Sequence, residues 1–424
     1  MRTLSVLQWN ILADGLANDG FLVPLSIDII KKHQIHQQLN ITIEEYYESQ
    51  LVPFKNSEGF LKKNLMDLFN ATNCLFLFFK LYHKKNVKEV DLKNWMANKE
   101  STIEKPDEWN VKKIGVEFKE NIHELIQNFK KTWFISIHIE NIKQLIDVKK
   151  RKKKISSIVE EYKPDIMVFE EDDYLEDFNG YSNEINGKRC KISKTNSTSK
   201  QLKLLRGDEN PVDDGTSVYW KKEKFDAIED YKLIYFDETV EQRTGIILVP
   251  LKEKQTNKSI LIIGTHLGSG KSENNESYRV QQIEKGFKNI KSLNYVDKFD
   301  CVILSMDGNS NPNFKTGKFE KEPNMWNTLK SIIPLKGIWE NGIDTNSIWS
   351  VNKFRGAASD QYRKIGEYER DFIDYVAYSG DLVFEKMLKE LNVKDEKIFF
   401  QLLPNEENPS DHTPLIVEFS MKEK

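Results

Sequence analysis

The chain has 424 residues, of which 39% are hydrophobic and 11% aromatic; this is enough apolar material for a sizeable folded core and excludes disorder as the default. Charged residues make up 30%, yet the formal net charge is only -3, so no global basic field marks a nucleic-acid binder, although a local basic rim would serve a short substrate. The three cysteines are scattered, odd in number and without zinc-site spacing, which indicates reduced thiols in an intracellular protein.

The amino-terminal segment, Met1–Leu7, runs directly into an expected strand and leaves no room for a cleaved targeting peptide. The longest apolar run, Leu75–Leu81, is too short to span a bilayer. We therefore expect a soluble intracellular protein without membrane association, in the cytoplasm rather than the nucleus.

The first expected strand is Leu4–Leu12, an apolar run that presents Asn10 near its end. A buried asparagine needs partners, which are either neighbouring backbone groups or a functional site. From residue 16 to 149 the pattern becomes mainly helical. In Phe60–Phe69 and Glu117–Phe129, for example, apolar residues recur every three or four positions. We expect this stretch to be a helical insertion that packs on itself, with a lid or a partner-docking module as the alternative.

Asp147–Glu161 is expected to form an amphipathic helix whose basic cluster is either a solvated face or a phosphate-steering surface. A buried strand, Asp165–Phe169, follows and ends in four consecutive acids. These acids repel one another unless solvent or a cation intervenes. The run is therefore either an exposed acidic loop or a site at which Glu171 binds a hard divalent ion such as Mg²⁺.

Three further strands are expected. Asp213–Phe225 reads as a turn followed by a strand with alternating faces, Gly245–Pro250 is a second β-rich run, and Ser259–Leu267 is a buried strand followed by a helix at Glu276–Ile290. The last of the strands presents His266, which is either a satisfied core residue or a ligand.

Cys301–Pro312 begins as a buried strand and ends in Asp307 and Asn309. This segment is either a plain turn or a site, because an acid and an amide two residues apart on a strand point to the same side of the sheet. The carboxyl ends of strands are where α/β proteins keep their chemistry.

The carboxyl-terminal region supplies an aspartate and a histidine that could form a hydrogen-bonded pair. Asp371–Ser379 reads as a strand that buries Asp374, a carboxylate that demands a partner. Pro409–Phe419 places Asp411 and His412 on the loop that enters the last strand. An aspartate that orients a histidine is the usual way to build a general base.

Taken in order, QWNIL, the acidic strand end at Glu171, THL, MDGNS, IDY and SDH resemble the endonuclease/exonuclease/phosphatase superfamily of metal-dependent phosphoesterases. WNILADGL, DDGTSVYWKKEKF and the Asn-Ser-Asn-Pro at 309–312 resemble its Ccr4-type branch, which includes deadenylases, nocturnin and the angel proteins. The resemblance covers Met1–Asp14 and about Lys150–Phe419. It implies a four-layer α/β sandwich of two packed mixed β-sheets flanked by helices. The catalytic domain would be 1–15 and 150–424, interrupted by the 16–149 insertion.

The resemblance also implies roles for the site residues. Glu171 would be the principal Mg²⁺ ligand with Asn10 beside it, and Mn²⁺ is the alternative ion. His412 would be the base, or a phosphate-binding imidazole, with its tautomer fixed by Asp374. The remaining roles concern water and substrate: Asp307 and Asn309 would position the attacking water and the phosphate, His266 would stabilise phosphate charge, Asp411 would complete the site, and Tyr368 would contact substrate.

Two departures from the family pattern bear on these roles. The chain has Met306-Asp307-Gly308-Asn309 where Gly-Asp-Phe-Asn or Gly-Asp-Leu-Asn is usual, and the aromatic residues nearest the adenine-stacking position are Tyr368 and Phe372. We expect a Mg²⁺-dependent phosphoesterase, foremost a 3′–5′ exoribonuclease of the deadenylase type acting on RNA. The alternatives are a nucleotide or RNA-end phosphatase, a DNA endonuclease or exonuclease, and a non-catalytic scaffold that binds a protein partner through 16–149.

Overall fold

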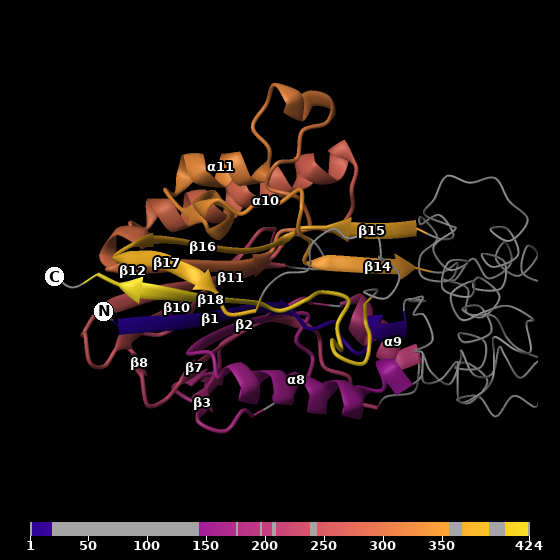
Figure 1. The fold of residues 1–424 in the computed structure, drawn as a ribbon, viewed down its shortest axis with the longest axis horizontal. Coiled ribbons are helices and arrows are strands. Elements are labelled where there is room, and N and C mark those ends of the chain that lie inside the picture. The colour runs from indigo at the N-terminus through magenta and orange to yellow at the C-terminus, as the bar shows by residue number, and fades with distance from the viewer. Residues whose placement is uncertain are drawn as a thin grey trace, which may run out of the picture.

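Two seven-stranded sheets face one another, with helices on both outer sides (Figure 1). The computed structural model describes residues 2–18, 144–174, 177–195, 197–205, 209–237, 244–355, 367–389 and 403–422. Both sheets mix parallel and antiparallel pairs, and the largest hydrophobic cluster contains residues of both. The expected four-layer α/β sandwich is therefore confirmed.

The first sheet is built around the amino-terminal strand β1 (Arg2–Asn10), which pairs antiparallel with the carboxyl-terminal strand and parallel with β2 (Ile166–Glu170). Its strand order is β17-β18-β1-β2-β7-β3, and β6 pairs with β7. The other strands are β3 (Tyr181–Ser182), β6 (Lys191–Ser193), β7 (Gly215–Lys221), β17 (Leu382–Met387) and β18 (Leu415–Met421). Its two central strands thus end together, at Asn10 and Glu170.

The second sheet has the order β13-β16-β12-β11-β10-β8, and β9 pairs with β10. Its strands are β8 (Phe225–Ala227), β9 (Lys232–Tyr235), β10 (Gly245–Glu253), β11 (Ser259–His266), β12 (Cys301–Asp307), β13 (Lys336–Gly337) and β16 (Asp374–Gly380). The central strands β11 and β12 are buried along nearly their whole length. Such continuous apolar runs are typical of strands covered on both faces.

Helices cover the outer faces of the sheets. α8 (Val148–Tyr162) lies on the first sheet, where Ile155, Ile158 and Val159 join a cluster that includes Trp9. The second sheet is covered by α10 (Glu273–Ser292) and α11 (Met325–Ile332) (Figure 1). The shorter elements are η1 (Leu16–Asn18), β4 (Glu184–Ile185), β5 (Lys188–Arg189), α9 (Thr198–Leu205), η3 (Val296–Lys298), η4 (Gly317–Glu320), η5 (Ile338–Asn341), β14 (Val351–Arg355) and β15 (Glu367–Asp371).

The predicted helix at Asp147–Glu161 is confirmed as α8, with Asp147 as its N-cap. Its basic cluster is not wholly a solvated face, because Arg151 is 1% exposed and donates to the backbone oxygens of Pro409 and Ile11 at 2.8 and 2.7 Å. A guanidinium with several donors can hold two loops at once. Arg151 thus ties the segment after β1 to the segment before β18.

The predicted insertion lies largely outside the described residues, which omit 19–143. The helices expected at Phe60–Phe69 and Glu117–Phe129 fall in this range, so they and the division into 1–15, 16–149 and 150–424 stay predictions. In the described part of the chain no helix combines the length and hydropathy needed to cross a membrane. Cys190 and Cys301 are buried free thiols there.

Candidate active site

The strand register places three polar residues side by side at the end of the second sheet where β11 and β12 terminate. In the parallel pair β11–β12, His266 lies opposite Asp307, and in the antiparallel pair β12–β16, Asp307 lies opposite Asp374. From the first sheet, Asn10 at the end of β1 donates its amide Nδ2 to Asp307 Oδ2 at 2.9 Å. Asp307, which is 1% exposed, is therefore contacted by polar residues of both sheets.

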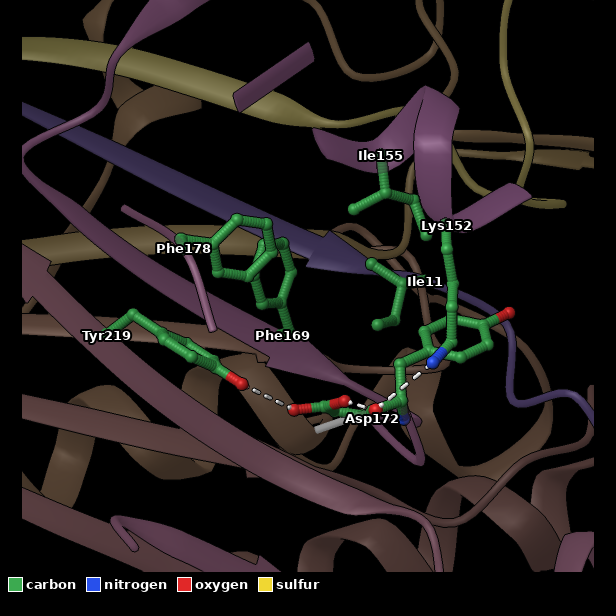
Figure 2. A pocket seen from close by; sticks show the side chains of 8 residues that line it. Ile11, Lys152, Ile155, Phe169, Asp172, Phe178 and Tyr219 are labelled. Atoms are coloured by element: carbon green, nitrogen blue, oxygen red, sulfur yellow. Dashed lines mark hydrogen bonds between the residues drawn. The ribbon is translucent and has the colours of Figure 1, made fainter. Parts of the chain in front are cut away.

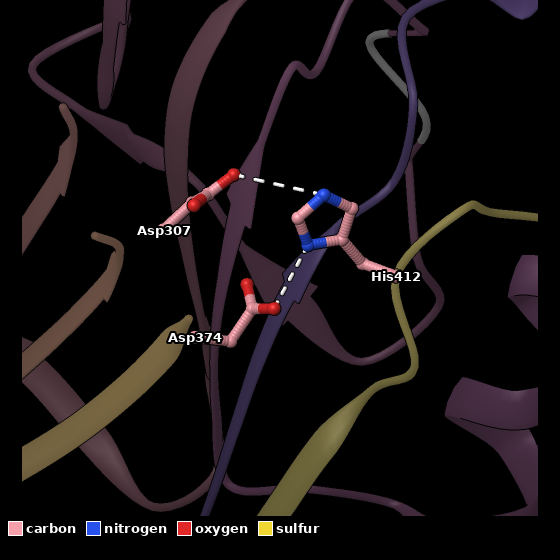
Figure 3. Close-up of side chains that lie close together, drawn as sticks. All are labelled: Asp307, Asp374 and His412. Atoms are coloured by element: carbon pink, nitrogen blue, oxygen red, sulfur yellow. Dashed lines mark hydrogen bonds and ion pairs between the residues drawn. The ribbon is translucent and has the colours of Figure 1, made fainter. Parts of the chain in front are cut away.

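Asp374 and His412 form a buried pair beside Asp307 (Figure 3). His412 Nδ1 lies 2.8 Å from Asp374 Oδ2, and its Nε2 lies 3.8 Å from Asp307 Oδ2. Burial lowers the pKa of His412, but the carboxylates of Asp374, Asp307 and Asp411 outweigh it and raise the pKa to about 10. At neutral pH His412 is thus an imidazolium whose Nδ1–H donates to Asp374.

The pKa of the Asp307 carboxyl is also displaced. Burial, and then the carboxylate of Asp374, raise it and outweigh the lowering by His412, Asn10 and the backbone N–H of Asn309, so that the pKa rises to about 6. A carboxyl group in this range is ionised at pH 7 and still basic enough to accept a proton from water.

His266 and Asn309 are also neighbours of Asp307. His266 Nε2 lies 3.4 Å from Asp307 Oδ2 and 3.0 Å from Asn309 Nδ2, which also donates to Leu267 O at 2.9 Å. Burial holds the pKa of His266 well below its ordinary value, and the ammonium of Lys194 lowers it further. His266 is therefore neutral where His412 is charged.

Asp307 and Asn309 do meet, but not by strand alternation. β12 ends at Asp307, and Asn309 has φ +50°, in the left-handed region that asparagine tolerates better than most residues. The backbone N–H of Asn309 donates to Asp307 Oδ1 at 2.9 Å. A tight turn after the strand, rather than the pleat, brings the acid and the amide into one site.

The four consecutive acids that begin with Glu170, the last residue of β2, have different surroundings. Glu170 is fully buried and accepts from Gln8 Nε2 at 2.9 Å. Asp172 accepts from the Tyr219 hydroxyl at 3.2 Å, at the wall of a small pocket (Figure 2). Asp173 accepts from the backbone N–H of Asp14 at 2.9 Å and forms an ion pair with Lys203. The exposed acidic loop considered from the sequence is thus not found, because three of these carboxylates are buried with partners.

Glu171 differs from its three acidic neighbours in being half-buried, with φ +55°. Its Oε2 accepts from the backbone N–H of Ala13 at 3.1 Å. Burial lowers the pKa of Lys194, but the carboxylates of Asp214 and Glu171 outweigh it and raise that pKa. Glu171 is thus a carboxylate held at a turn, and carboxylate oxygen is a ligand type that Mg²⁺ and Mn²⁺ prefer.

Asp307, Asp374 and His412 also form a group whose ligand atoms lie within 4.8 Å of one another, among the residues described. In this group Nδ1 of His412 is already bonded to Asp374. Asp374 Oδ1, in turn, accepts from Gln8 Nε2 at 2.7 Å. These bonds define a histidine–carboxylate pair within the group.

Asp411 lies at the rim of the same group. Its Oδ2 is 4.0 Å from His412 Nε2 and 2.6 Å from Lys353 Nζ, and all three residues are buried. Tyr368 lies in β15 with its backbone opposite Phe354, and its side chain is outside the described residues. Phe372 is fully buried against the ring of Trp339, so it is a core residue rather than a substrate-stacking ring.

Three polar residues of the site were not anticipated from the sequence: Gln8, Lys194 and Lys353. Gln8 precedes Asn10 by two residues in an apolar strand, and a buried polar residue on the same strand face was a usable signal. Lys194 Nζ lies 3.2 Å from His266 Nδ1, although 72 residues separate them in the chain. Nothing in the local sequence distinguishes either lysine from the many that are solvated.

The fold and the site together define a two-sheet α/β sandwich with a buried acid, amide and imidazole constellation where its strands end. No protein-family model matches the chain, and no curated protein matches it in sequence. Among solved structures it is similar to the human nocturnin catalytic domain with bound sulfate, at 19% identity and a TM-score of 0.47, covering 65% of this chain and 88% of that one.

Two further similar structures are ANGEL2, a 2′,3′-cyclic phosphatase, and an endonuclease/exonuclease/phosphatase from Bacteroides vulgatus. The ANGEL2 match has 17% identity, a TM-score of 0.46 and coverage of 65% of this chain and 88% of that one. The Bacteroides match has 12% identity, a TM-score of 0.40 and coverage of 66% and 94%. It bears the name of the superfamily that the sequence motifs resemble. At these identities and TM-scores the likeness carries no activity over to this chain, whose function is inferred from its own site.

Proposed function

We propose that the chain is a metal-dependent hydrolase of phosphoester bonds and a member of the endonuclease/exonuclease/phosphatase superfamily. The observation that carries this proposal is the surroundings of Asp307 Oδ2. That oxygen lies 2.9 Å from Asn10 Nδ2, 3.4 Å from His266 Nε2 and 3.8 Å from His412 Nε2. A single basic oxygen ringed by an amide and two imidazoles suits the activation of water beside an anionic phosphate.

In this mechanism Asp307 accepts the proton of the attacking water. The sequence left the base open between His412 and another group, and the raised pKa of His412 supports Asp307, because an imidazolium has no lone pair with which to take a proton. His412, oriented by Asp374, would donate Nε2–H to a phosphate oxygen. Asn309 and neutral His266 would orient the phosphate from the other side.

Glu171 would hold the divalent cation, with Asn10 beside it. When bound, the cation supplies Lewis-acid stabilisation of the charge on the phosphate oxygens. Glu171 fits this role because its three acidic neighbours, Glu170, Asp172 and Asp173, are buried and committed to protein partners. Mg²⁺ is the ion we propose, and Mn²⁺ has the same ligand preference.

The proposed substrate is RNA, shortened from its 3′ end. A phosphatase acting on a nucleotide or an RNA end is the second candidate. A terminal phosphate carries more negative charge than a diester, and the ammonium of Lys194, whose Nζ lies 3.2 Å from His266 Nδ1, would suit it.

The test is product analysis with purified protein, in Mg²⁺ and separately in chelator. The substrates are 5′-labelled RNA ending in oligo(A), mixed-sequence RNA, single-stranded DNA and NADP⁺, with Asp307→Asn as the matched control. Metal-dependent shortening of RNA that the variant lacks would support the exoribonuclease. Phosphate release without shortening would favour the phosphatase. Absence of metal-dependent hydrolysis of every substrate would refute the proposal.

A further inference from the structure

The first half of α8 concentrates positive charge on a chain whose formal net charge is -3. Every residue of Lys149–Lys154 is basic, the first turn contains no acid, and Glu160 and Glu161 come at the opposite end of the helix. The N-terminal end of a helix carries a partial positive charge, so cations placed there are unfavourable for the helix itself. The stability of α8 therefore does not account for this arrangement of charge.

Three of these lysines form one exposed surface, which we call the α8 lysine face: Lys149, Lys150 and Lys153. Residues three and four positions apart are neighbours on a helix surface, so Lys153 lies beside both of the others. Among the described residues none of the three forms an ion pair, and the ammonium of Lys150 donates to Gln144 Oε1 at 3.3 Å. Their positive charges can therefore meet an anion from solution.

The helix that carries the α8 lysine face also holds two loops of the candidate active site. Arg151, in the middle of the basic run, is buried and donates to Ile11 O at 2.7 Å and to Pro409 O at 2.8 Å. Ile11 directly follows Asn10, and Pro409 lies on the loop that carries His412. Because α8 lies on the outer side of the first sheet (Figure 1), the same turns of helix contact the site loops from within and present the lysines to solvent.

We propose that the α8 lysine face binds the sugar–phosphate backbone of an RNA strand whose 3′ end occupies the candidate active site. This inference rests on the proposed function and concerns the part of the substrate beyond the scissile bond. A polyanionic strand complements a group of lysines next to a phosphoesterase site, because each ammonium that neutralises a phosphate releases a counterion. Contacts to backbone carry no base sequence, so this surface separates polynucleotides from mononucleotides without selecting a base.

The test measures the affinity of the full-length protein for 5′-labelled mixed-sequence RNA as a function of KCl concentration, in an Asp307→Asn background that prevents hydrolysis. The lysine variant combines Lys149→Gln, Lys150→Gln and Lys153→Gln. On a single strand each phosphate contact contributes about 0.7 to the slope of log K against log[salt], so the variant should lose about 2 from that slope. Between ~1 M and ~0.1 M salt the affinity of the unsubstituted face should therefore rise about 100-fold more than that of the variant.

Two further variants control for charge and for folding. Replacing the exposed lysines of α10 removes the same charge from the opposite outer side of the sandwich and should leave the slope unchanged; they are Lys285, Lys288 and Lys291, each changed to Gln. Changing the three lysines of the α8 face to Arg keeps their charge and should retain the slope. Because the α8 lysines are exposed at the N-terminal end of a helix, their loss should not lower Tm.

With Asp307 restored, the α8 variant should show a raised KM for RNA and an unchanged kcat, and any hydrolysis of NADP⁺ should be unaffected. A salt slope equal to that of the α10 control would overturn the inference and leave the proposed function standing. Binding of the lysine face to anionic phospholipid vesicles in place of RNA would overturn it too. Wild-type protein that binds RNA and hydrolyses no substrate would instead refute the proposed function, and with it the placement of the RNA 3′ end.

Discussion

Replacing Asp374 by asparagine keeps the shape of the side chain and removes the charge that faces His412. The two atoms concerned, His412 Nδ1 and Asp374 Oδ2, are 2.8 Å apart. Unit charges at this separation interact by about 6 kcal/mol at an effective dielectric constant of ~20, equivalent to about 4 pKa units. The carboxylate shares its charge between two oxygens, and one of them is bound to Gln8.

We therefore expect Asp374→Asn to lower the pKa of His412 by about 2 to 4 units from its wild-type value of about 10. The assay is a pH titration of the imidazole carbon resonances in histidine-labelled protein, with the His412 signal assigned by its loss in His412→Gln. Asp165→Asn is the matched control, because Asp165 is a buried carboxylate paired with Lys221 and Lys224 instead. A wild-type His412 that titrates near its ordinary pKa, or one unmoved by Asp374→Asn, would refute the reasoning.

Three other predictions concern metal binding, pH and stability. Glu171→Gln should weaken Mn²⁺ binding by roughly tenfold or more, measured by calorimetry, with little change in Tm; unchanged affinity would remove Glu171 from the metal site. The pKa of His412 is raised from 6.5 to about 10 in the folded protein. The stability that the charged imidazole contributes is therefore fully present below the unfolded-state pKa of 6.5 and is lost as pH rises through the folded-state pKa of about 10. Urea unfolding should show this loss in wild type and not in His412→Gln. Glu276→Gln should lower the free energy of unfolding by about 3 kcal/mol, because Arg279, which is fully buried and 2.8 Å from Glu276, loses its charged partner; urea unfolding that shows no loss would contradict this.

The strands and the polar residues near their ends could be predicted from the sequence. The apolar runs Leu4–Leu12 and Ser259–Leu267 extend past Asn10 and His266, whereas the strands of the structure end at Asn10, His266 and Asp307. The partnership of Asp374 with His412 also followed from a simple requirement, since a buried carboxylate needs a hydrogen-bond donor and a histidine is a natural one.

The charge states of the two histidines could not be predicted in this way. The sequence does not show that Asp374, Asp307 and Asp411 all face His412, or that burial and Lys194 act on His266. The opposite pKa shifts of two histidines of the same site arise from neighbours that are distant in the chain.

The sequence by itself determined the hydrophobic pattern, and with it the strands, the helices that cover them and the polar residues at the strand ends. Those features are local, because the spacing of apolar residues can be read directly from the sequence of each segment. Tertiary structure alone decided that Lys353 meets Asp411 across 58 residues and that Gln8 bridges Glu170 and Asp374. Such pairs depend on sheet order and register, which bring distant segments within a few ångströms and carry no signature in either segment.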